Sequence, residues 1–466
     1  TGHPVDDPFV PTSTPYLAVP LDGSVGISTG RARSVDEIRG LLDARLREAD
    51  VRGASFGPLS SAAFAIEAAL AWNTIYEPRH DRVVTTVGRL WNEEYGGYAL
   101  FGWDNFFLAY ALTLFDRDLA FATVVEHLAG RTPDGFIPND NAGNGRTSLD
   151  RSQPPVGALM VREIYRRFPE RWFLEATFDD LLAWNRWWPH ARANGALLAY
   201  GSSKAPNPFN EPDRETMVTA RYESGMDDSP MYEDVPFSAE THTMALQDVG
   251  LTSLYVVDCE ALADMARVLG REAIARELEG RADDYRRALD TLWHEPTGLY
   301  LNRRTDTGDW SFRLSPTHFY PLLAGVPSPE RAARMIERHL LNRDEFWGEH
   351  LLPSIARSDP EFPRQRYWRG AIWPPLNFLT YAGVRRAGHA ASQRALADAS
   401  ISLFMREWQR HGYVSENYSA VTGTGDDERL SSDRFHSWGV LFALPAFIEA
   451  GFISAPADAG SVAAHP

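Results

Sequence analysis

Helical periodicity dominates the pattern of hydrophobic and polar positions along the chain. Residues 248–269 are apolar nearly all round, which is typical of a buried helix, and Gly270 then supplies a helix-ending signal. Residues 271–293 follow with large apolar side chains three or four positions apart, with one doubled interval: Ile274, Leu278, Tyr285, Leu289 and Leu292. This spacing predicts an amphipathic helix that packs on the buried one.

Similar helical patterns recur along most of the chain. A capping box, Ser34 followed by Glu37 three residues later, predicts a helix start, and Leu41, Leu42 and Leu46 follow on one face. Further helices are predicted at 59–76, 104–115, 119–128, 155–168, 172–188, 330–341, 376–386, 392–409 and 435–450. Alternation of period two is scarce, so strands should be few and short.

A buried helix followed by an amphipathic one, repeated about six times, predicts an all-α fold with two concentric rings of helices. This is an (α/α)6 barrel, a six-hairpin toroid whose long loops form the pocket side. A flat helical solenoid is the alternative, but the chain shows no strict repeat of about 34 residues. The expected domains are an extended N-terminal arm or domain remnant at 1–33, a catalytic barrel at 34–453 and a flexible tail at 454–466.

Charge and composition exclude several classes of partner. The chain has 466 residues and a net charge of −17, which argues against nucleic acid and against an anionic membrane surface. No apolar run approaches the roughly 18 residues of a membrane helix. The single cysteine, Cys259, lies in an apolar helical pattern and is predicted to be a buried structural thiol, without a disulfide or a thiolate metal site in the chain.

The first residue and the choice of basic residues suggest where the protein is found. Thr1 in place of Met indicates a processed or trimmed start, and nearly all basic residues are Arg, with Lys204 the visible exception. We expect a bacterial protein in the cytoplasm, with secretion as the alternative. The oligomeric state is not predicted.

Five loops between the predicted helices share one composition, mixing aromatic residues with acids or Arg, amides, and Gly or Pro: 95–107, 134–155, 221–230, 366–377 and 411–420. Sugar recognition needs this mixture, because aromatic rings cover the apolar face of a pyranose while carboxylates, amides and guanidinium groups bind its hydroxyls. A phosphate-binding Gly loop, an HExxH motif and a GxSxG motif are all absent.

Acidic residues in two of these loops suit glycoside hydrolysis. That reaction uses two carboxyl groups on opposite faces of the scissile bond, one of them kept protonated by burial or by a nearby like charge. The stretch 221–234 carries Asp227 with Asp228 and Glu223 as neighbouring like charges, on a shaped turn with Gly and Pro. Glu416, flanked by aromatic and amide residues, is the best candidate for the second carboxylate.

Several motifs occur in one order between roughly residues 90 and 440. They are WD at Trp103-Asp104, IPN at Ile137-Pro138-Asn139, RSQPP at Arg151–Pro155, ESGxDxS at Glu223–Ser229, YWRG with a following Trp at Tyr367–Gly370 and Trp373, and ENY at Glu416-Asn417-Tyr418. In these motifs the chain resembles glycoside hydrolase family 63, closest to its bacterial mannosylglycerate and glucosylglycerate hydrolases and more distantly to the trehalases.

The resemblance implies an (α/α)6 barrel and an inverting α-glycosidase that removes terminal α-linked glucose or mannose from a small glycoside or oligosaccharide. It assigns Asp227 as the general acid and Glu416 as the general base. The substrate-binding residues carried over with the motifs are Trp103, Asp104, Asn139, Arg151, Gln153, Glu223, Tyr367, Trp368, Arg369, Gly370, Trp373 and Tyr418. The expected partner is a small carbohydrate, with no cofactor and no metal.

Other functions remain open at this point. A trehalase-like or phosphorolytic reaction could run on the same barrel. The acid pairs Asp227-Asp228 and Glu233-Asp234 would also suit a Mg²⁺-dependent terpene cyclase or prenyltransferase. A carbohydrate-binding barrel without catalysis is a further alternative. The sequence leaves both the sugar and the aglycone undetermined.

Overall fold

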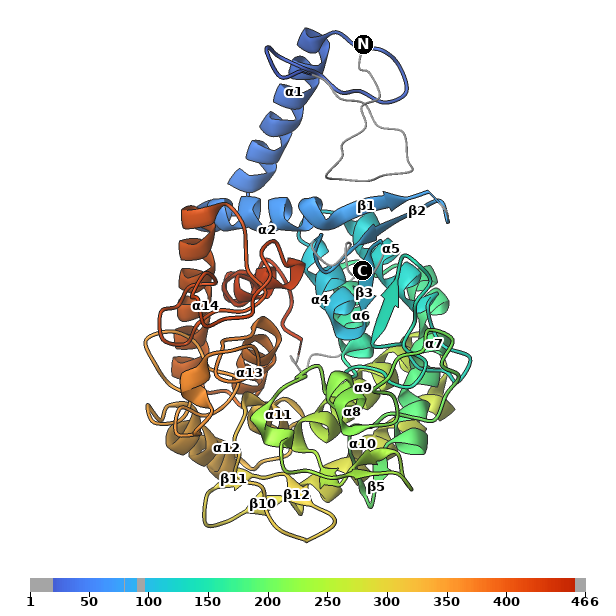
Figure 1. Ribbon diagram of the computed structural model, residues 1–466, viewed down its shortest axis with the longest axis vertical. Coiled ribbons are helices and arrows are strands. Elements are labelled where there is room, and N and C mark those ends of the chain that lie inside the picture. The colour runs from blue at the N-terminus through green and yellow to red at the C-terminus, as the bar shows by residue number, and fades with distance from the viewer. Residues whose placement is uncertain (1–19, 79, 90–96, 457–466) are drawn as a thin grey trace. The chain divides into compact units, whose positions relative to one another are not determined.

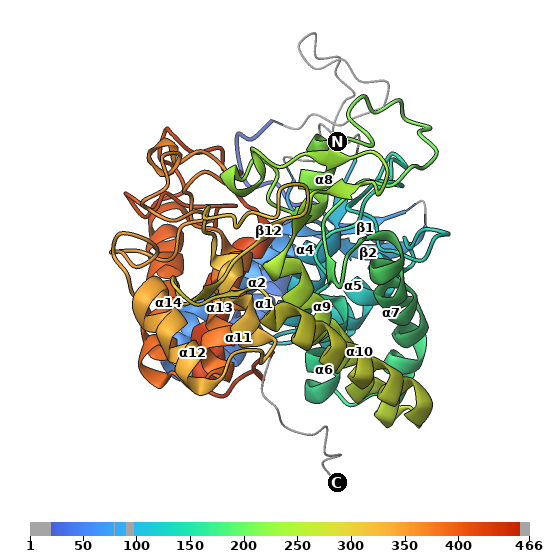
Figure 2. The same ribbon diagram turned by 90° about the horizontal axis from the view of Figure 1, so that it is seen from below.

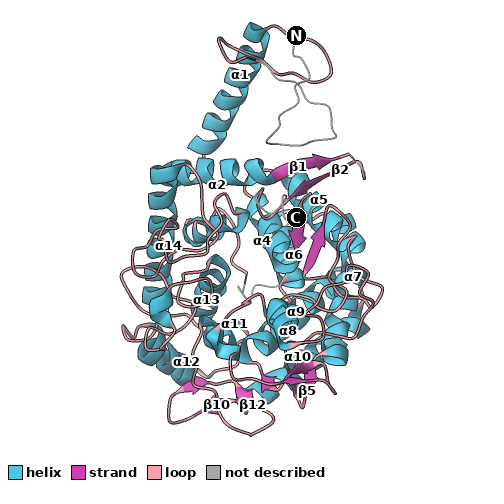
Figure 3. Cartoon of the chain, in the orientation of Figure 1, coloured by secondary structure: helices cyan, strands magenta, loops and turns pink. Residues whose placement is uncertain are grey.

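The computed structural model describes residues 20–78, 80–89 and 97–456. In these residues the fold is mostly helical and its strands are short pairs, as predicted (Figure 3). Most of the predicted arm, residues 1–19, and most of the predicted tail, residues 457–466, lie outside the described residues. None of the described helices is both long and apolar enough to span a bilayer.

The chain divides into two compact units, with the division between Phe64 and Ala65. The first unit contains α1 (Val35–Ala54) and η1 (Gly57–Leu59), and α2 (Ser60–Asn73) begins in it. The capping box predicted for α1 is present, since the Ser34 side chain accepts from Glu37 N and the Glu37 side chain accepts from Ser34 N. However, α1 buries none of its residues. The barrel was expected to begin at residue 34, before α1. The two units instead divide after α1, between Phe64 and Ala65.

Six helical elements of the second unit form a closed ring. They are α4 (Gly102–Leu112), α6 (Gly157–Arg167), α9 (Val249–Val268), α11 (Tyr320–Leu323), α13 (Pro374–Arg386) and the 3-10 helix η6 (Ser437–Phe442). Each contacts the next, and η6 contacts α4 (Figure 1). Every residue of α4 and α11 is buried, as are most residues of the other members. Sequences that are apolar on nearly all sides can be satisfied only by such burial.

Amphipathic helices pack on the outside of this ring: α5 (Arg117–Leu128), α7 (Arg171–Ala191), α10 (Glu272–Asp290), α12 (Pro329–Met335) and α14 (Ala390–His411). The α9–α10 pair confirms the buried and amphipathic helices predicted at 248–293, and Cys259 on α9 is buried and free. The long loops and α8 (Met217–Ser224) gather at one end of the helices (Figure 2).

The structure departs from the predicted helices in three places. The helix predicted at 435–450 is divided into η6 and α15 (Leu444–Glu449), and Pro445, which lacks an N–H donor, lies at the start of the second piece. The helix predicted at 330–341 continues after α12 as the π-helical turn η4 (Ile336–Leu340). Among the α-helices, α8 and α11, the latter with the preceding η3 (Pro316–Phe319), were not predicted.

The described strands form six antiparallel pairs: β1 (Thr74–Glu77) with β2 (Arg82–Thr85), β3 (Ala99–Phe101) with β4 (Asp140–Ala142), β5 (Ala193–Asn194) with β6 (Leu197–Leu198), β7 (Phe237–Ser238) with β8 (Thr243–Met244), β9 (Leu246–Gln247) with β12 (Arg303–Arg304), and β10 (Trp293–His294) with β11 (Leu299–Tyr300). In the second pair Phe101 lies opposite Asp140, and Gly102 N donates to Asn139 O at 3.0 Å. This pairing brings the WD and IPN motifs together at the start of α4.

Candidate active site

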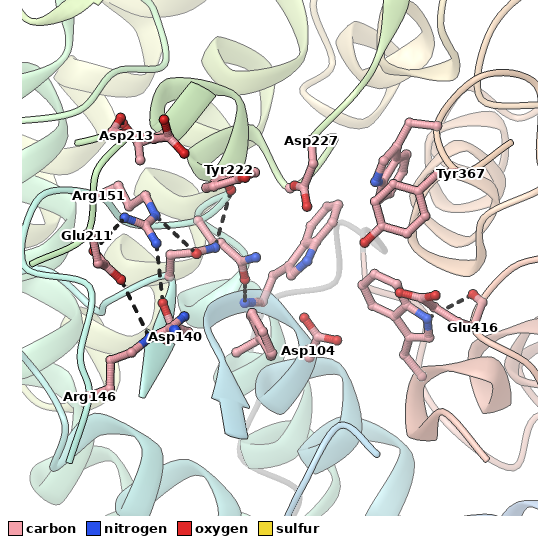
Figure 4. Close-up of a pocket in the computed structure, with 18 of the residues that line it drawn as sticks. Asp104, Asp140, Arg146, Arg151, Glu211, Asp213, Tyr222, Asp227, Tyr367 and Glu416 are labelled. Carbon is pink, nitrogen blue, oxygen red and sulfur yellow. Dashed lines mark hydrogen bonds and ion pairs between the residues drawn. The ribbon is translucent and has the colours of Figure 1, made fainter. Parts of the chain in front are cut away.

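A cavity of about 460 Å³ lies in the second unit, a volume typical of small-molecule sites. Its lining residues are Phe101, Trp103, Asp104, Asn139, Asp140, Arg146, Arg151, Gln153, Glu211, Pro212, Asp213, Thr219, Tyr222, Gly225, Asp227, Tyr367, Trp368, Glu416, His436 and Trp438. They come from the five loops that the sequence singled out, from the segment before α8, from α8 itself and from the segment that enters η6. Figure 4 shows how the labelled side chains lie around it.

Asp227 is placed in the cavity by the turn that ends α8. Gly225 ends the helix with φ of +68°, a conformation that glycine adopts without strain. A Cβ at Gly225 would lie 2.7 Å from Cζ2 of Trp103, so only glycine lets this turn lie against the indole. Asp227 is half-buried, and the loss of surrounding water, followed by the negative charge of Asp228, raises its pKa to about 7.

The neighbouring Asp228 does not line the cavity. Its carboxylate accepts from Trp368 N at 2.9 Å and from Arg369 Nε at 3.2 Å. Asp228 therefore ties the loop of Tyr367 and Trp368 to the loop of Asp227, and its charge also favours the protonated form of Asp227.

Glu416 enters the cavity from the loop between α14 and η6. Its backbone is fixed because Glu416 N donates to Asp433 O at 2.8 Å and Trp438 Nε1 donates to Glu416 O at 3.0 Å. Its Oε2 accepts from Asp433 N at 3.3 Å and from Asn417 Nδ2 at 3.4 Å. Burial, and then the charge of Asp433, raise the pKa of Glu416 well above its usual range.

Asp104, in the first turn of α4, is a third carboxyl in the same cavity. Burial raises its pKa well above the usual range, and the charge of Asp227 adds to this. The charges of Asp104 and Asp227 in turn raise the pKa of Glu416. In Figure 4 Asp227 and Asp104 lie on one side of the cavity, with Glu416 and Tyr367 on the other. In the described part of the chain no hydrogen bond joins Asp227 to Glu416, although both carboxyls line the same cavity.

Aromatic side chains form part of the cavity wall. Trp103 and Trp368 are buried and line it, and Trp438 meets Trp103 edge to face at 5.9 Å between ring centroids. Trp373 lies behind Trp368, since the two rings are stacked at 3.6 Å with an interplanar angle of 6°. Trp373 Nε1 also donates to Tyr367 O at 3.0 Å. The wall that faces the cavity is thus supported by a second aromatic layer.

The substrate-binding residues predicted from the motifs fall into two groups. Those that line the cavity are Trp103, Asp104, Asn139, Arg151, Gln153, Tyr367 and Trp368. Those that are not among its lining residues are Glu223, Arg369, Gly370, Trp373 and Tyr418. The second group supports the loops: Tyr418, for example, accepts from Ser415 N through its hydroxyl at 3.0 Å.

Glu223 differs most from expectation. It is fully buried, and both of its oxygens accept from Arg192, from Nε at 2.5 Å and from a terminal nitrogen at 2.8 Å. Ser152 N and Gly201 N donate to it as well. Arg192 neutralises the Glu223 carboxylate. Through these hydrogen bonds Glu223 joins the end of α8 to the segments that carry Ser152, Arg192 and Gly201. The like charge that raises the pKa of Asp227 comes from Asp228 rather than from Glu223.

Sequence reasoning missed several lining residues: His436, Trp438, Tyr222, Asp140, Arg146, Glu211 and Asp213. His436 Nε2 lies 4.0 Å from Oε1 of Glu416, and burial lowers the pKa of His436 to about 3, so the imidazole is neutral. The tripeptide His436-Ser437-Trp438 was a usable signal, but the sequence pattern placed it in the first turn of the helix predicted at 435–450. Glu211 and Asp213 lie in a segment whose only sequence signal was its acidity.

In the residues that the structure describes, no group of three or more His, Cys, Asp or Glu side chains could hold a metal ion.

Comparison with known proteins gives consistent relationships. The family model of the mannosylglycerate hydrolase MGH1-like glycoside hydrolase domain matches residues 97–438. The mannosylglycerate hydrolase of Thermus thermophilus is 26% identical over 418 residues, which cover 73% of this chain and 92% of the relative. The cytosolic neutral trehalase of Kluyveromyces lactis is 25% identical over 391 residues, 72% of this chain and 51% of that protein.

A solved structure shares the fold. The GH63 mannosylglycerate hydrolase of Thermus thermophilus, in complex with glucose, superposes with a TM-score of 0.66 at 23% identity, over 83% of this chain and 99% of that one. A mostly helical scaffold and these matches define a glycoside hydrolase. The chain belongs to the mannosylglycerate hydrolase MGH1-like family, within glycoside hydrolase family 63, as the sequence motifs predicted.

Proposed function

We propose that the chain is an inverting α-glycosidase that releases terminal α-linked glucose or mannose from a small glycoside. The observation that carries the proposal is the placement of Asp227 and Glu416, which reach one cavity from separate loops and opposite sides. Inverting enzymes keep their two carboxyls about 6.5–9.5 Å apart to admit a water beside the sugar. The scaffold would be an (α/α)6 barrel whose inner ring is α4, α6, α9, α11, α13 and η6.

Asp227 is proposed as the general acid. Its pKa of about 7 leaves much of it protonated near neutral pH, as an acid that protonates the leaving oxygen requires. Glu416 is proposed as the general base that takes a proton from the attacking water. Although burial raises its pKa, Oε2 of Glu416 accepts from two N–H groups, which favours the ionised form. A proton on Asp227 also removes one of the charges that oppose ionisation of Glu416.

The glycone would lie between these two carboxyls and beside Asp104. Trp103 and Trp368 offer aromatic surface to the sugar ring, and the Asp104 carboxyl can accept from its hydroxyls. Gln153 is held in place because its Oε1 accepts from Trp103 N at 3.1 Å. This arrangement suits a single terminal hexose.

The acid and base roles can be separated with two substrates. A glycosyl fluoride needs little protonation of its leaving group, whereas an alkyl glycoside needs a general acid. Asp227→Asn should lose about 10²–10⁴-fold in kcat on an α-glucoside or α-mannoside but stay within about tenfold on the α-glycosyl fluoride. Glu416→Gln should lose activity on both. Asp309→Asn, an exposed acid outside the cavity, is the matched control.

NMR of the first-formed sugar tests the stereochemistry. An α-glycoside should yield the β-anomer first; the α-anomer would refute inversion. Sugar release that requires phosphate would instead favour phosphorolysis, and a preference for trehalose among α-glucosides would favour the trehalase-like alternative. Near-full activity of both Asp227→Asn and Glu416→Gln on the alkyl glycoside would refute the catalytic pair.

A further inference from the structure

The part of the cavity that would receive the leaving group is built from a second set of side chains. If the glycone lies between Asp227 and Glu416, as the proposed function requires, the aglycone must lie on the other side of Asp227. Figure 4 shows that side occupied by Asp140, Arg146, Arg151, Glu211, Asp213 and Tyr222. Recognition of the aglycone therefore depends on how these charges are balanced.

The two guanidinium groups found among the described lining residues are already paired with carboxylates. Arg151 lies 2.8 Å from Asp150, 3.5 Å from Asp140 and 3.6 Å from Glu211. Arg146 lies 3.3 Å from Asp140 and 3.5 Å from Glu211. Arg214, which does not line the cavity, makes further ion pairs with Asp150 and Glu211. Neither lining guanidinium is left to bind an anionic ligand.

Asp213 adds a negative charge that is not balanced. It is exposed at the cavity, and in the described part of the chain its carboxylate makes no ion pair; only its backbone oxygen accepts, from the hydroxyls of Thr216 and Thr219. Among the described residues that line the cavity, six carry carboxyl groups and two carry guanidinium groups. Because Asp140 and Glu211 are paired with Arg146 and Arg151, the carboxylate of Asp213 leaves this part of the cavity with excess negative charge.

We propose that the leaving group of the natural substrate is neutral and rich in hydroxyls, a polyol or a second sugar, rather than a carboxylic acid such as glycerate. Hydroxyls can donate to the carboxylates of Glu211 and Asp213, whereas an aglycone carboxylate would meet like charge without a free Arg or Lys among the described residues that line the cavity. This inference rests on the proposed function, and it concerns the substrate class within it.

The test compares matched glycosides that differ only in the charge of the aglycone: α-glucosylglycerol with α-glucosylglycerate, and α-mannosylglycerol with α-mannosylglycerate. For the preferred sugar, kcat/KM on the glycerol compound should exceed that on the glycerate compound at least about tenfold. A disaccharide arm, with α,α-trehalose and an α-linked mannobiose, distinguishes a sugar from a polyol as leaving group. Because salt screens charge repulsion, raising the ionic strength should increase kcat/KM for the glycerate compound selectively.

Two variants test whether these carboxylates set the preference. Asp213→Asn removes the unpaired charge, and Glu211→Gln frees Arg146 and Arg151 from one of their partners. Each should raise the ratio of kcat/KM for the glycerate compound over the glycerol compound by several-fold. Asp309→Asn, which makes the same charge change at an exposed site outside the cavity, should leave the ratio unchanged. Asp213 is exposed, so its variant should fold even if Glu211→Gln does not.

The outcomes are distinguishable. Equal or faster turnover of the glycerate compound by the wild-type chain would overturn this inference and leave the proposed glycosidase in place. The inference would also be overturned by two results together. These are a folded Asp213→Asn variant with an unchanged ratio of kcat/KM for the glycerate over the glycerol compound, and a kcat/KM for the glycerate compound that does not change with ionic strength. No turnover of any of these glucosides and mannosides would overturn the proposed function, and this inference with it.

Discussion

Replacing Asp227 with Asn should stabilise the fold at alkaline pH while it removes catalysis. The Asp227 carboxyl has its pKa raised to about 7 by loss of water and by the charge of Asp228. An unfolded aspartate titrates near pH 3.9. The folded chain therefore binds more protons between these values, and its stability falls as pH rises from about 4 to about 7. Asparagine has the same shape but does not titrate, so the free energy of unfolding of the variant does not fall with pH through this residue.

The size of the effect follows from the titration. Each pKa unit corresponds to about 1.4 kcal/mol, so moving from pH 5 to pH 8 costs the wild-type chain about 2–3 kcal/mol through Asp227. The second unit has about 400 residues, and unfolding entropy near 2.1 cal/mol/K per residue gives about 0.8 kcal/mol per degree. The Tm of Asp227→Asn minus that of the wild type should therefore grow by about 3 °C between pH 5 and pH 8.

Differential scanning calorimetry of wild type, Asp227→Asn and Asp309→Asn at both pH values measures this. Asp309 is exposed, so its variant controls for the loss of one charge, and its Tm difference should stay within about 1 °C. Comparing each variant with wild type at the same pH cancels the other groups that titrate. A Tm difference for Asp227→Asn that is constant, or smaller at pH 8, would refute the claim that the cavity raises the pKa of Asp227.

Three further outcomes are expected. Gly225→Ala should cost roughly 1–3 kcal/mol in urea unfolding and lower kcat, because the added Cβ is strained at the positive φ and clashes with Trp103; wild-type kinetics would contradict this. Arg192→Met should cost about 3–5 kcal/mol by leaving Glu223 buried and unpaired, and the double variant with Glu223→Gln should recover most of it; equal losses in both would count against the ion pair. NMR of labelled histidine should show no titration of His436 between pH 5 and pH 8, and an inflection near 6.5 would refute a neutral imidazole.

The sequence predicted most of the helices because their two kinds of hydrophobic pattern differ clearly. The run at 248–269 is apolar on all sides and became the buried α9, while the one-faced run after it became α10. It could not predict α11, which has only four residues and contains Pro321. A segment this short has no periodicity, and only its neighbours in the ring make it a helix.

The placement of α1 shows a second limit. Its capping box was read correctly, and the spacing of Leu41, Leu42 and Leu46 suggested a buried face. These side chains are 54%, 59% and 57% exposed. Spacing shows which residues share a face of a helix, but it does not show whether another element covers that face.

The catalytic pair was proposed from motifs, because residues that must be adjacent to shape a turn are also adjacent in sequence. Gly225 and Asp227 illustrate this: the glycine that ends α8 stands two positions before the carboxyl that it places. Long-range partners left no comparable signal. Arg192, which neutralises Glu223, lies 31 positions away in a different element, and nothing in the ESG motif indicates that its glutamate is buried.

The electrostatics of the cavity explain why two adjacent aspartates serve different purposes. Asp228 is tied to Trp368 N and Arg369, so its negative charge is held in place and remains close to Asp227. Among the described residues Asp227 has no such side-chain partner, and it lines the cavity, where loss of water and then the nearby charge of Asp228 raise its pKa. Loss of surrounding water is the larger cause of the raised pKa of Asp227, and the charge of Asp228 adds to it. In the Asp-Asp sequence one carboxyl thus positions a loop, and its charge helps to keep the other protonated, as the proposed role of Asp227 requires.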